Sequence, residues 1–359
     1  MKRDARCAQQ PVEPRFALAA LLLFLSPVPA LAAPATNSRP VRECATCHPA
    51  QAKPHPATSM GHAAESVAEC GVLQTHPSMT FSANGYSYKI ERKGDQSLYS
   101  VSDGASTLTV PIAWAFGLGA AGQTYVLEKD GAYYESFVSY YKQPDALDLT
   151  MGDQKFKPTT LLEALGRAMG EREKVACFNC HSTNSVTDSK LTVDKMVAGV
   201  QCERCHGDAT NHLAGLKKGD SSLFAMKRLG VMSSEETNNF CGQCHRTWEQ
   251  IASNGPHGVL NVRFQPYRLT NSRCFDGDDK RIACTGCHNP HEEIDRVTAN
   301  YDSKCQSCHA SGKSGANVCK VATKDCAGCH MPKVELPGSH HQFSDHDIRI
   351  VRANSRYPD

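Results

Sequence analysis

Cysteine and histidine are the residues of this sequence whose spacing points most directly to chemistry. The pattern Cys-x-x-Cys followed at once by His occurs seven times in the 359 residues. Two thiols at this spacing can add to the two vinyl groups of a porphyrin, and the adjacent imidazole can then bind the iron. Zinc sites and thiol redox sites also use Cys-x-x-Cys pairs, but neither requires the His that follows. The pattern therefore predicts seven covalently attached c-type haems.

These motifs, numbered first to seventh in chain order, take up fourteen of the eighteen cysteines. The predicted porphyrin-binding residues are Cys44, Cys47, Cys177, Cys180, Cys202, Cys205, Cys241, Cys244, Cys284, Cys287, Cys305, Cys308, Cys326 and Cys329. The predicted proximal iron ligands are His48, His181, His206, His245, His288, His309 and His330.

Nine further histidines lie outside the motifs and can supply the second axial ligand of each iron. A second imidazole lowers the reduction potential of a haem, whereas a methionine raises it. His291 lies three residues after His288, too close to reach the opposite face of the same porphyrin, so we expect it to bind the iron of a neighbouring motif. By the same argument, we expect His212 to bind an iron other than that of His206. The predicted distal ligands are His62, His212, His257, His291, His341 and His346.

Two of these assignments leave alternatives open. For the first motif, His55, Met60 and His62 are all candidates, and we prefer His62 because it lies on a plausible helix, whereas the flanking prolines hold His55 extended. His340 and His341 are adjacent, so we expect at most one of them to bind iron. We expect the tail that carries them to fold back over the haems.

Three cysteines, Cys70, Cys274 and Cys319, lie outside the motifs and after the first 32 residues. In an oxidising compartment two of them can form a disulfide. We expect Cys274 to pair with Cys319 and Cys70 to remain a free thiol.

Residues 1–32 have the features of a secretory signal. A basic start precedes a short apolar run at 16–25, and a small-x-small cleavage pattern follows at 30–32. Ten apolar residues are too few to span a bilayer. We therefore expect a periplasmic or secreted protein with no integral membrane segment after cleavage of the signal.

The net charge of the chain indicates which class of partner it can bind. The formal charge is +2, and the first 32 residues hold four basic and two acidic side chains, so the remainder is close to neutral. The haem propionates add negative charge, which argues against a nucleic-acid surface. We expect redox partner proteins instead.

The motifs and the tyrosines divide the chain. We expect a single-haem segment at 33–70, a tyrosine-rich β subdomain with a short helix at 71–176, and a six-haem domain with a ligand-donating tail at 177–359. The expected fold is mainly α and irregular, with a haem-packed core of short helices and loops and a small antiparallel β subdomain inserted after the first motif. Alternating apolar residues and turn signals predict its strands at 86–91, 98–101, 107–114, 123–128 and 133–141, and a helix at 161–169. The glycine-rich stretch 117–122 favours a flexible connection or close backbone packing over a nucleotide-binding loop.

The sequence resembles the multihaem c-type cytochromes of the cytochrome c-554 type, which have doubled CxxCH motifs and belong to a wider superfamily that includes hydroxylamine oxidoreductase and the multihaem nitrite reductases. The likeness lies in residues 202–207 with His212, in 284–288 with Pro290 and His291, and in 326–333 with the tail histidines. It covers 177–350 well and 41–63 loosely, and it leaves the tyrosine-rich middle unexplained.

The resemblance implies stacked parallel and perpendicular haem pairs, mostly bis-His irons, and electron transfer. The alternative is an oxidoreductase that acts on a small nitrogen or sulfur species at one five-coordinate haem. Family enzymes of this kind often mark the open haem with Lys in place of the motif His. All seven motifs here end in His, which favours electron transfer, although the sequence leaves an enzymatic role undecided.

The motif count generates a direct prediction. A pyridine haemochrome assay on the purified protein should find seven haems per chain, and the double substitution Cys305→Ala, Cys308→Ala should remove one of them. Bound zinc together with a much lower haem content would contradict the assignment.

Overall fold

The computed structural model describes residues 43–220, 226–310, 318–354 and 356–358. The predicted secretory signal, residues 1–32, lies outside the described residues. Within the described ranges, each helix falls short of the length or the apolar character that a membrane crossing requires.

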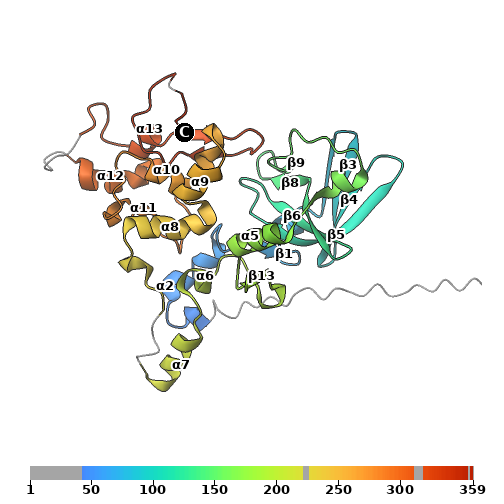
Figure 1. The fold of residues 1–359 in the computed structure, drawn as a ribbon, viewed down its shortest axis with the longest axis horizontal. Coiled ribbons are helices and arrows are strands. Elements are labelled where there is room, and N and C mark those ends of the chain that lie inside the picture. The colour runs from blue at the N-terminus through green and yellow to red at the C-terminus, as the bar shows by residue number, and fades with distance from the viewer. Residues whose placement is uncertain (1–42, 221–225, 311–317, 355, 359) are drawn as a thin grey trace, which may run out of the picture. The chain divides into compact units, whose positions relative to one another are not determined.

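An antiparallel sheet of eight strands is the largest regular element (Figure 1). Seven strands follow the order β10-β7-β6-β5-β4-β3-β2, and β1 pairs with β5. The bounds are β1 Ala64–Ser66, β2 Ser78–Ala83, β3 Tyr86–Lys93, β4 Gln96–Ser102, β5 Thr107–Phe116, β6 Thr124–Lys129, β7 Ala132–Ser136 and β10 Gly166–Ala168.

Eight short strands form two-stranded ladders. They are β8 Val138–Tyr141 with β9 Ala146–Leu149, β11 Ser182–Thr183 with β14 Val197–Ala198, β12 Val186–Thr187 with β13 Lys190–Leu191, and β15 Lys333–Glu335 with β16 Gln342–Ser344.

The expected fold class, mainly α with a small β subdomain, is wrong, because the described residues hold sixteen strands and a large sheet. The sheet includes strands before and after the predicted strand region 86–141. Strand β1 comes from the segment of the first motif, and β10 replaces the second half of the expected helix 161–169. That helix ends at Leu165 because Gly166 follows in a left-handed conformation and approaches β7 so closely that an added Cβ would lie 2.0 Å from the Glu135 carbonyl oxygen.

The individual strand predictions fare better. Strands β3 to β6 cover the predicted ranges within a few residues. The Asp130-Gly131 pair, both at positive φ, makes the tight turn between β6 and β7. The predicted run 133–141 divides at Phe137, because β8 leaves the sheet to pair with β9. In the glycine-rich stretch, a Cβ on Gly119 would lie 2.7 Å from the Tyr140 ring, so this loop is closely packed.

Buried aromatic residues form the core of this sheet. Tyr88, Tyr99, Tyr125 and Phe137 are almost completely buried, and the ring centroids of Tyr88 and Phe137 lie 6.0 Å apart. Cys70 belongs to the same cluster as a free thiol, and burial raises its pKa to about 12. Both hydrophobic clusters of the described residues are built from positions 67–198, so the last five motifs lie outside them.

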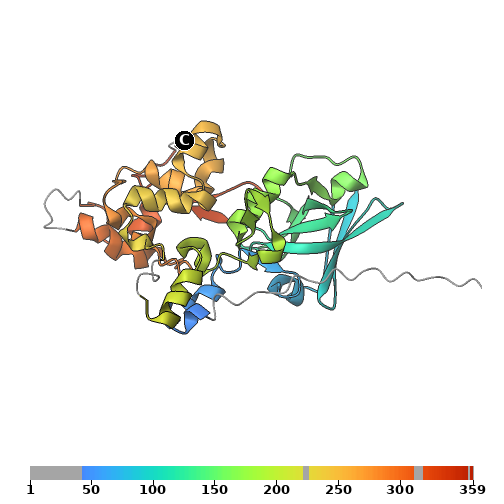
Figure 2. The same cartoon turned by 60° about the horizontal axis from the view of Figure 1, so that its bottom comes forward.

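Short helices carry the motifs, and five of these helices end at the motif histidine (Figures 1 and 2). In a helix, residues three apart lie on one face, so both motif cysteines can meet one porphyrin edge. The helices are α2 Pro49–Ala52, α3 Gly71–Thr75, α4 Leu161–Leu165, α5 Glu171–His181, α6 Cys202–His206, α7 Thr210–Lys218, α8 Ser234–His245, α9 Trp248–Asn254, α10 Gln265–Thr270, α11 Cys284–Cys287, α12 Asp302–His309 and α13 Cys326–His330.

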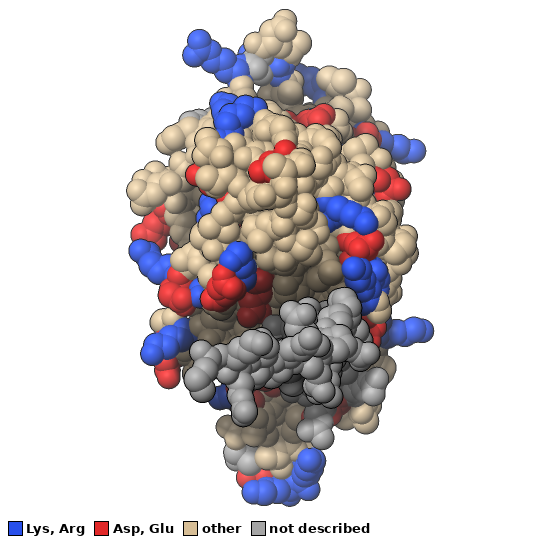
Figure 3. Space-filling view, turned by 90° about the vertical axis from the view of Figure 1, so that its right-hand side faces the viewer, with Lys and Arg blue, Asp and Glu red and all other residues tan. Residues whose placement is uncertain are grey.

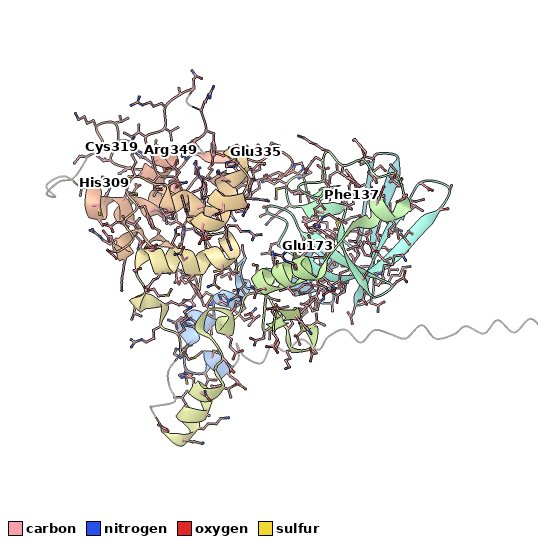
Figure 4. The ribbon with its side chains drawn as sticks, in the orientation of Figure 1. Phe137, Glu173, His309, Cys319, Glu335 and Arg349 are labelled. Atoms are coloured by element: carbon pink, nitrogen blue, oxygen red, sulfur yellow. The ribbon has the colours of Figure 1, made fainter. Side chains whose placement is uncertain are left out.

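The sheet core can be tested with two phenylalanines. Phe137→Ala should lower the free energy of unfolding by about 3–5 kcal/mol, because Phe137 is 1% exposed and leaves a cavity (Figure 4). Phe156, whose ring lies 6.1 Å from Phe137 but which is 47% exposed, is the matched control. Urea unfolding followed by far-UV circular dichroism measures both. Equal losses in the two variants would contradict this account of the core.

Candidate haem-binding sites

Several motif histidines are held by their Nδ1 atom. The Nδ1 of His181 hydrogen-bonds to the Ala63 carbonyl oxygen at 2.9 Å, and that of His330 to the Arg349 carbonyl oxygen at 2.8 Å. The Nδ1 of His206 makes the same kind of contact with a carbonyl oxygen at 3.1 Å. Metal-binding imidazoles commonly donate their second N–H in this way, which fixes the tautomer and leaves Nε2 for the metal. These three side chains are therefore oriented as iron ligands would be.

Three of the motif histidines face a histidine from outside the motifs. The ring centroids are 6.5 Å apart for His48 and His212, 6.1 Å for His206 and His291, and 6.3 Å for His288 and His346. Two imidazoles that bind one metal ion from opposite sides, each at about 2 Å, have centroids about 6 Å apart. The spacing of each pair therefore fits an iron atom between the two rings.

The facing histidines come from distant parts of the chain. His212 lies on α7, next to α2, which follows directly after His48 (Figure 1). The Nδ1 of His346 hydrogen-bonds to the Ser344 carbonyl oxygen at 3.0 Å. The Nδ1 atom of His291 lies 3.3 Å from the Asn289 Oδ1 atom. Both rings are thus held by Nδ1, as the motif histidines are.

The other three predicted distal ligands are placed differently. The Nδ1 of His62 lies 2.7 Å from the Glu65 carboxylate, whose hydrogen bond raises the pKa of His62. The His341 ring packs edge-on against Phe343, and burial lowers its pKa. His257 is exposed, immediately before the short helix Gly258–Arg263.

Three histidines use Nε2 for contacts within the protein. The Nε2 of His55 lies 2.7 Å from the Val200 carbonyl oxygen, that of His76 lies 3.1 Å from Asp145, and that of His340 lies 2.7 Å from Asp148. These contacts occupy Nε2, the nitrogen that the histidines held by Nδ1 leave for the iron. They favour His62 over His55 and His341 over His340 as ligands.

The C-terminal tail is anchored by a buried ionic cluster that sequence reasoning missed. The Arg268 guanidinium, fully buried, donates to Asp345 at 2.8 Å and to Asp347 at 3.3 Å. Burial alone would raise the pKa of Asp345, but the hydrogen bonds from Arg268 hold it below its usual value. His346 lies between these two aspartates in the sequence, and the Arg349 carbonyl accepts the hydrogen bond of His330. One cluster therefore positions histidines of two different sites.

The expected disulfide between Cys274 and Cys319 is absent, because both are free thiols. Cys319 is exposed in the loop that leads to α13 (Figure 4). Cys274 is half-buried, and burial, followed by the neighbouring Cys305 and Cys308 thiols, raises its pKa. Both cysteines lie in the motif-rich part of the sequence, but this does not indicate whether their side chains meet.

The family model described as "Cytochrome c554 and c-prime" matches residues 136–207, which include the second and third motifs. The multiheme cytochrome MtrA of Shewanella baltica (strain OS185) is 27% identical over 194 residues, 50% of this chain and 50% of that protein. The chain thus spans about half the length of this curated relative. The outer cell wall cytochrome OcwA, a crystal structure, superposes on 86% of this chain and 79% of its own with a TM-score of 0.49 and 14% identity.

The tail cluster generates a prediction. Arg268→Met should lower stability by up to about 3 kcal/mol, because Asp345 loses both hydrogen bonds from Arg268 and keeps the one from Arg349. It should also convert one haem from low-spin to high-spin, because His346 loses its support. Arg268→Lys retains one charged donor and should restore much of the low-spin signal. Electron paramagnetic resonance and the visible spectrum report the spin state. A destabilised variant with unchanged spin state would show that the cluster only stabilises the fold.

Proposed function

Because this chain is a multihaem c-type cytochrome, we propose that it binds seven haems and passes electrons through them in the periplasm or outside the cell. Each haem, when bound, supplies an iron that alternates between Fe(II) and Fe(III). The protein contributes two thioether-forming cysteines and one imidazole from each motif, together with a second imidazole from elsewhere in the chain.

The three facing imidazole pairs carry this proposal. An iron held between two histidines has no open position for a substrate, so it is suited to electron transfer rather than catalysis. In each pair the second histidine lies outside the motif it serves: His212 faces the first motif, His291 the third and His346 the fifth. Ligands that cross between motifs hold neighbouring haems close together, which favours fast electron exchange. We assign His62, His257 and His341 to three of the remaining four irons.

One observation favours the second candidate function. Nine histidines lie outside the motifs, and three of them use Nε2 in contacts with the protein, so six could bind seven irons through Nε2 without breaking one of these contacts. One iron is then left with a different sixth ligand or with an open position. An open iron would allow a reaction with a small nitrogen or sulfur species.

Electron transfer requires redox partners, and we propose that these are proteins. On the face shown in Figure 3, Lys and Arg side chains are interspersed with Asp and Glu side chains. Mixed charge of this kind suits transient docking better than binding to a polyanion.

The two functions can be separated by spin state. We expect the oxidised protein to show low-spin signals from at least six haems. If the seventh is high-spin and its signal changes on addition of nitrite or sulfite, the catalytic function is supported. A fully low-spin spectrum would contradict the catalytic function and support electron transfer only. High-spin signals from several haems would contradict the imidazole pairs.

A single ligand substitution gives a sharper test. His291→Ala should create one high-spin haem and raise one reduction potential, because an imidazole is lost from one iron. His76→Ala is the matched control, since the His76 imidazole hydrogen-bonds to Asp145 and is not assigned to any iron. Spectra of His291→Ala that match the parent protein would exclude His291 as a ligand.

A further inference from the structure

The motifs contact one another in an order that differs from their order in the sequence. The His48 ring of the first motif lies 6.5 Å from the ring of His212, six residues after the third motif, which joins the first motif to the third. The third motif reaches the fourth through Arg204, whose Nη2 donates to the Cys244 sulfur at 3.8 Å. The first motif therefore neighbours the third, and the third neighbours the fourth.

From the fourth motif onward, the contacts follow the sequence. The Cys284 thiol of the fifth motif donates at 3.5 Å to the Asn238 Oδ1 atom on α8, the helix of the fourth motif. Helices α8 and α11, which carry these two motifs, are also in contact. The ring of Tyr301, the residue before α12, lies 5.4 Å from the His288 ring, which places the sixth motif beside the fifth. The first turn of α13, with the seventh motif, donates its Cys326 N–H at 2.8 Å to Asp302, the first residue of α12.

The second motif stands apart from this series. It contacts the fourth motif through the Cys180 thiol, which donates to the Gln243 carbonyl oxygen at 3.7 Å. Its other neighbours belong to the sheet: the His181 ring stacks on Phe116 at 4.9 Å, and Phe178 packs edge-on against Trp114 at 6.1 Å. The second motif is thus connected to the others on one side and covered by the sheet on the other.

Arg204 lies where three motifs meet. It belongs to the third motif, its Nε donates to the Asn179 carbonyl oxygen of the second at 2.9 Å, and its Nη2 contacts Cys244 of the fourth. The side chain is half-buried, so its charge is incompletely screened by solvent.

Resting on the proposed function, we infer that electrons follow these contacts, in the order first, third, fourth, fifth, sixth and seventh motif, with the second motif as a branch that joins at Arg204. The motif sulfurs become bonded to the porphyrin edges, so neighbouring sulfurs bring those edges together. Each step transfers one electron, oxidising one Fe(II) and reducing its Fe(III) neighbour, and no atom or proton moves.

Solvent exposure identifies the two ends of this path. Of the fourteen motif cysteines, Cys47 and Cys329 are the exposed ones, and they belong to the first and the seventh motif. Electrons therefore enter and leave at these two motifs, where a partner protein can approach the porphyrin edge.

The junction at Arg204 can be tested by spectroelectrochemistry of the haem-loaded full chain. A cation stabilises the reduced, less positive haem, so Arg204→Gln should lower three of the seven reduction potentials and leave the other four unchanged. Arg204→Lys should restore most of the shift. The control is Lys89→Gln, which removes one positive charge from an exposed position on β3 and should move none.

Movement of a single potential, or of none, in Arg204→Gln would overturn the junction. A wild-type protein with fewer than seven haems would overturn the proposed function instead. If Arg204→Gln fails to fold, an anomalous iron map of wild-type crystals decides the order. The iron of the first motif should then lie nearest that of the third, and an iron of the first motif nearest that of the second would refute the inferred path.

Discussion

The placement of an imidazole from a distant segment opposite a motif imidazole is the constraint on which the rest of this structure depends. Each motif supplies its own first ligand, but the partner rings of His48, His206 and His288 come from α7, from the residues after the fifth motif and from the C-terminal tail. The chain between the two histidines of a pair must therefore fold so that their rings face each other. The hydrophobic clusters end at position 198, so the later motifs have little side-chain core to organise them. In our proposal the porphyrins and their axial ligands take over that task.

Histidine side chains of the second motif and of the tail hydrogen-bond to the segments that form the strands. The Ala63 carbonyl accepts the hydrogen bond of His181, and the adjacent β1 strand pairs with β5. His340 of the tail reaches Asp148 in β9 at 2.7 Å. The family match at 136–207 includes both the end of the sheet segment and two motifs, since it begins at the end of β7 and ends just after the third motif. The tyrosine-rich segment thus contacts the second motif and the tail. It covers one side of the second motif, the branch of the inferred electron path.

The cofactor chemistry could be predicted from the sequence, because covalent attachment requires a short, contiguous motif. Strands with alternating apolar residues, such as β3 and β4, could be predicted for the same local reason. The extent of the sheet could not, because β1 and β10 are three residues long and are defined by their partners. Arg268 shows the same limit in the candidate site. Nothing around this residue marks it as buried, and its partners lie 77 and 79 positions further along the chain.

The distance along the chain between His48 and His212 has a consequence for biogenesis. In our proposal haem is attached to the exported polypeptide before it folds, so the porphyrin at the first motif would be bound covalently before the segment that carries His212 has crossed the membrane. During translocation this group would carry a vacant coordination position, open to oxygen and to stray thiols. The folding of α7 against α2 would end that vulnerability, which makes closure of the N-terminal centre a late event in maturation, although its cysteines are the first to emerge.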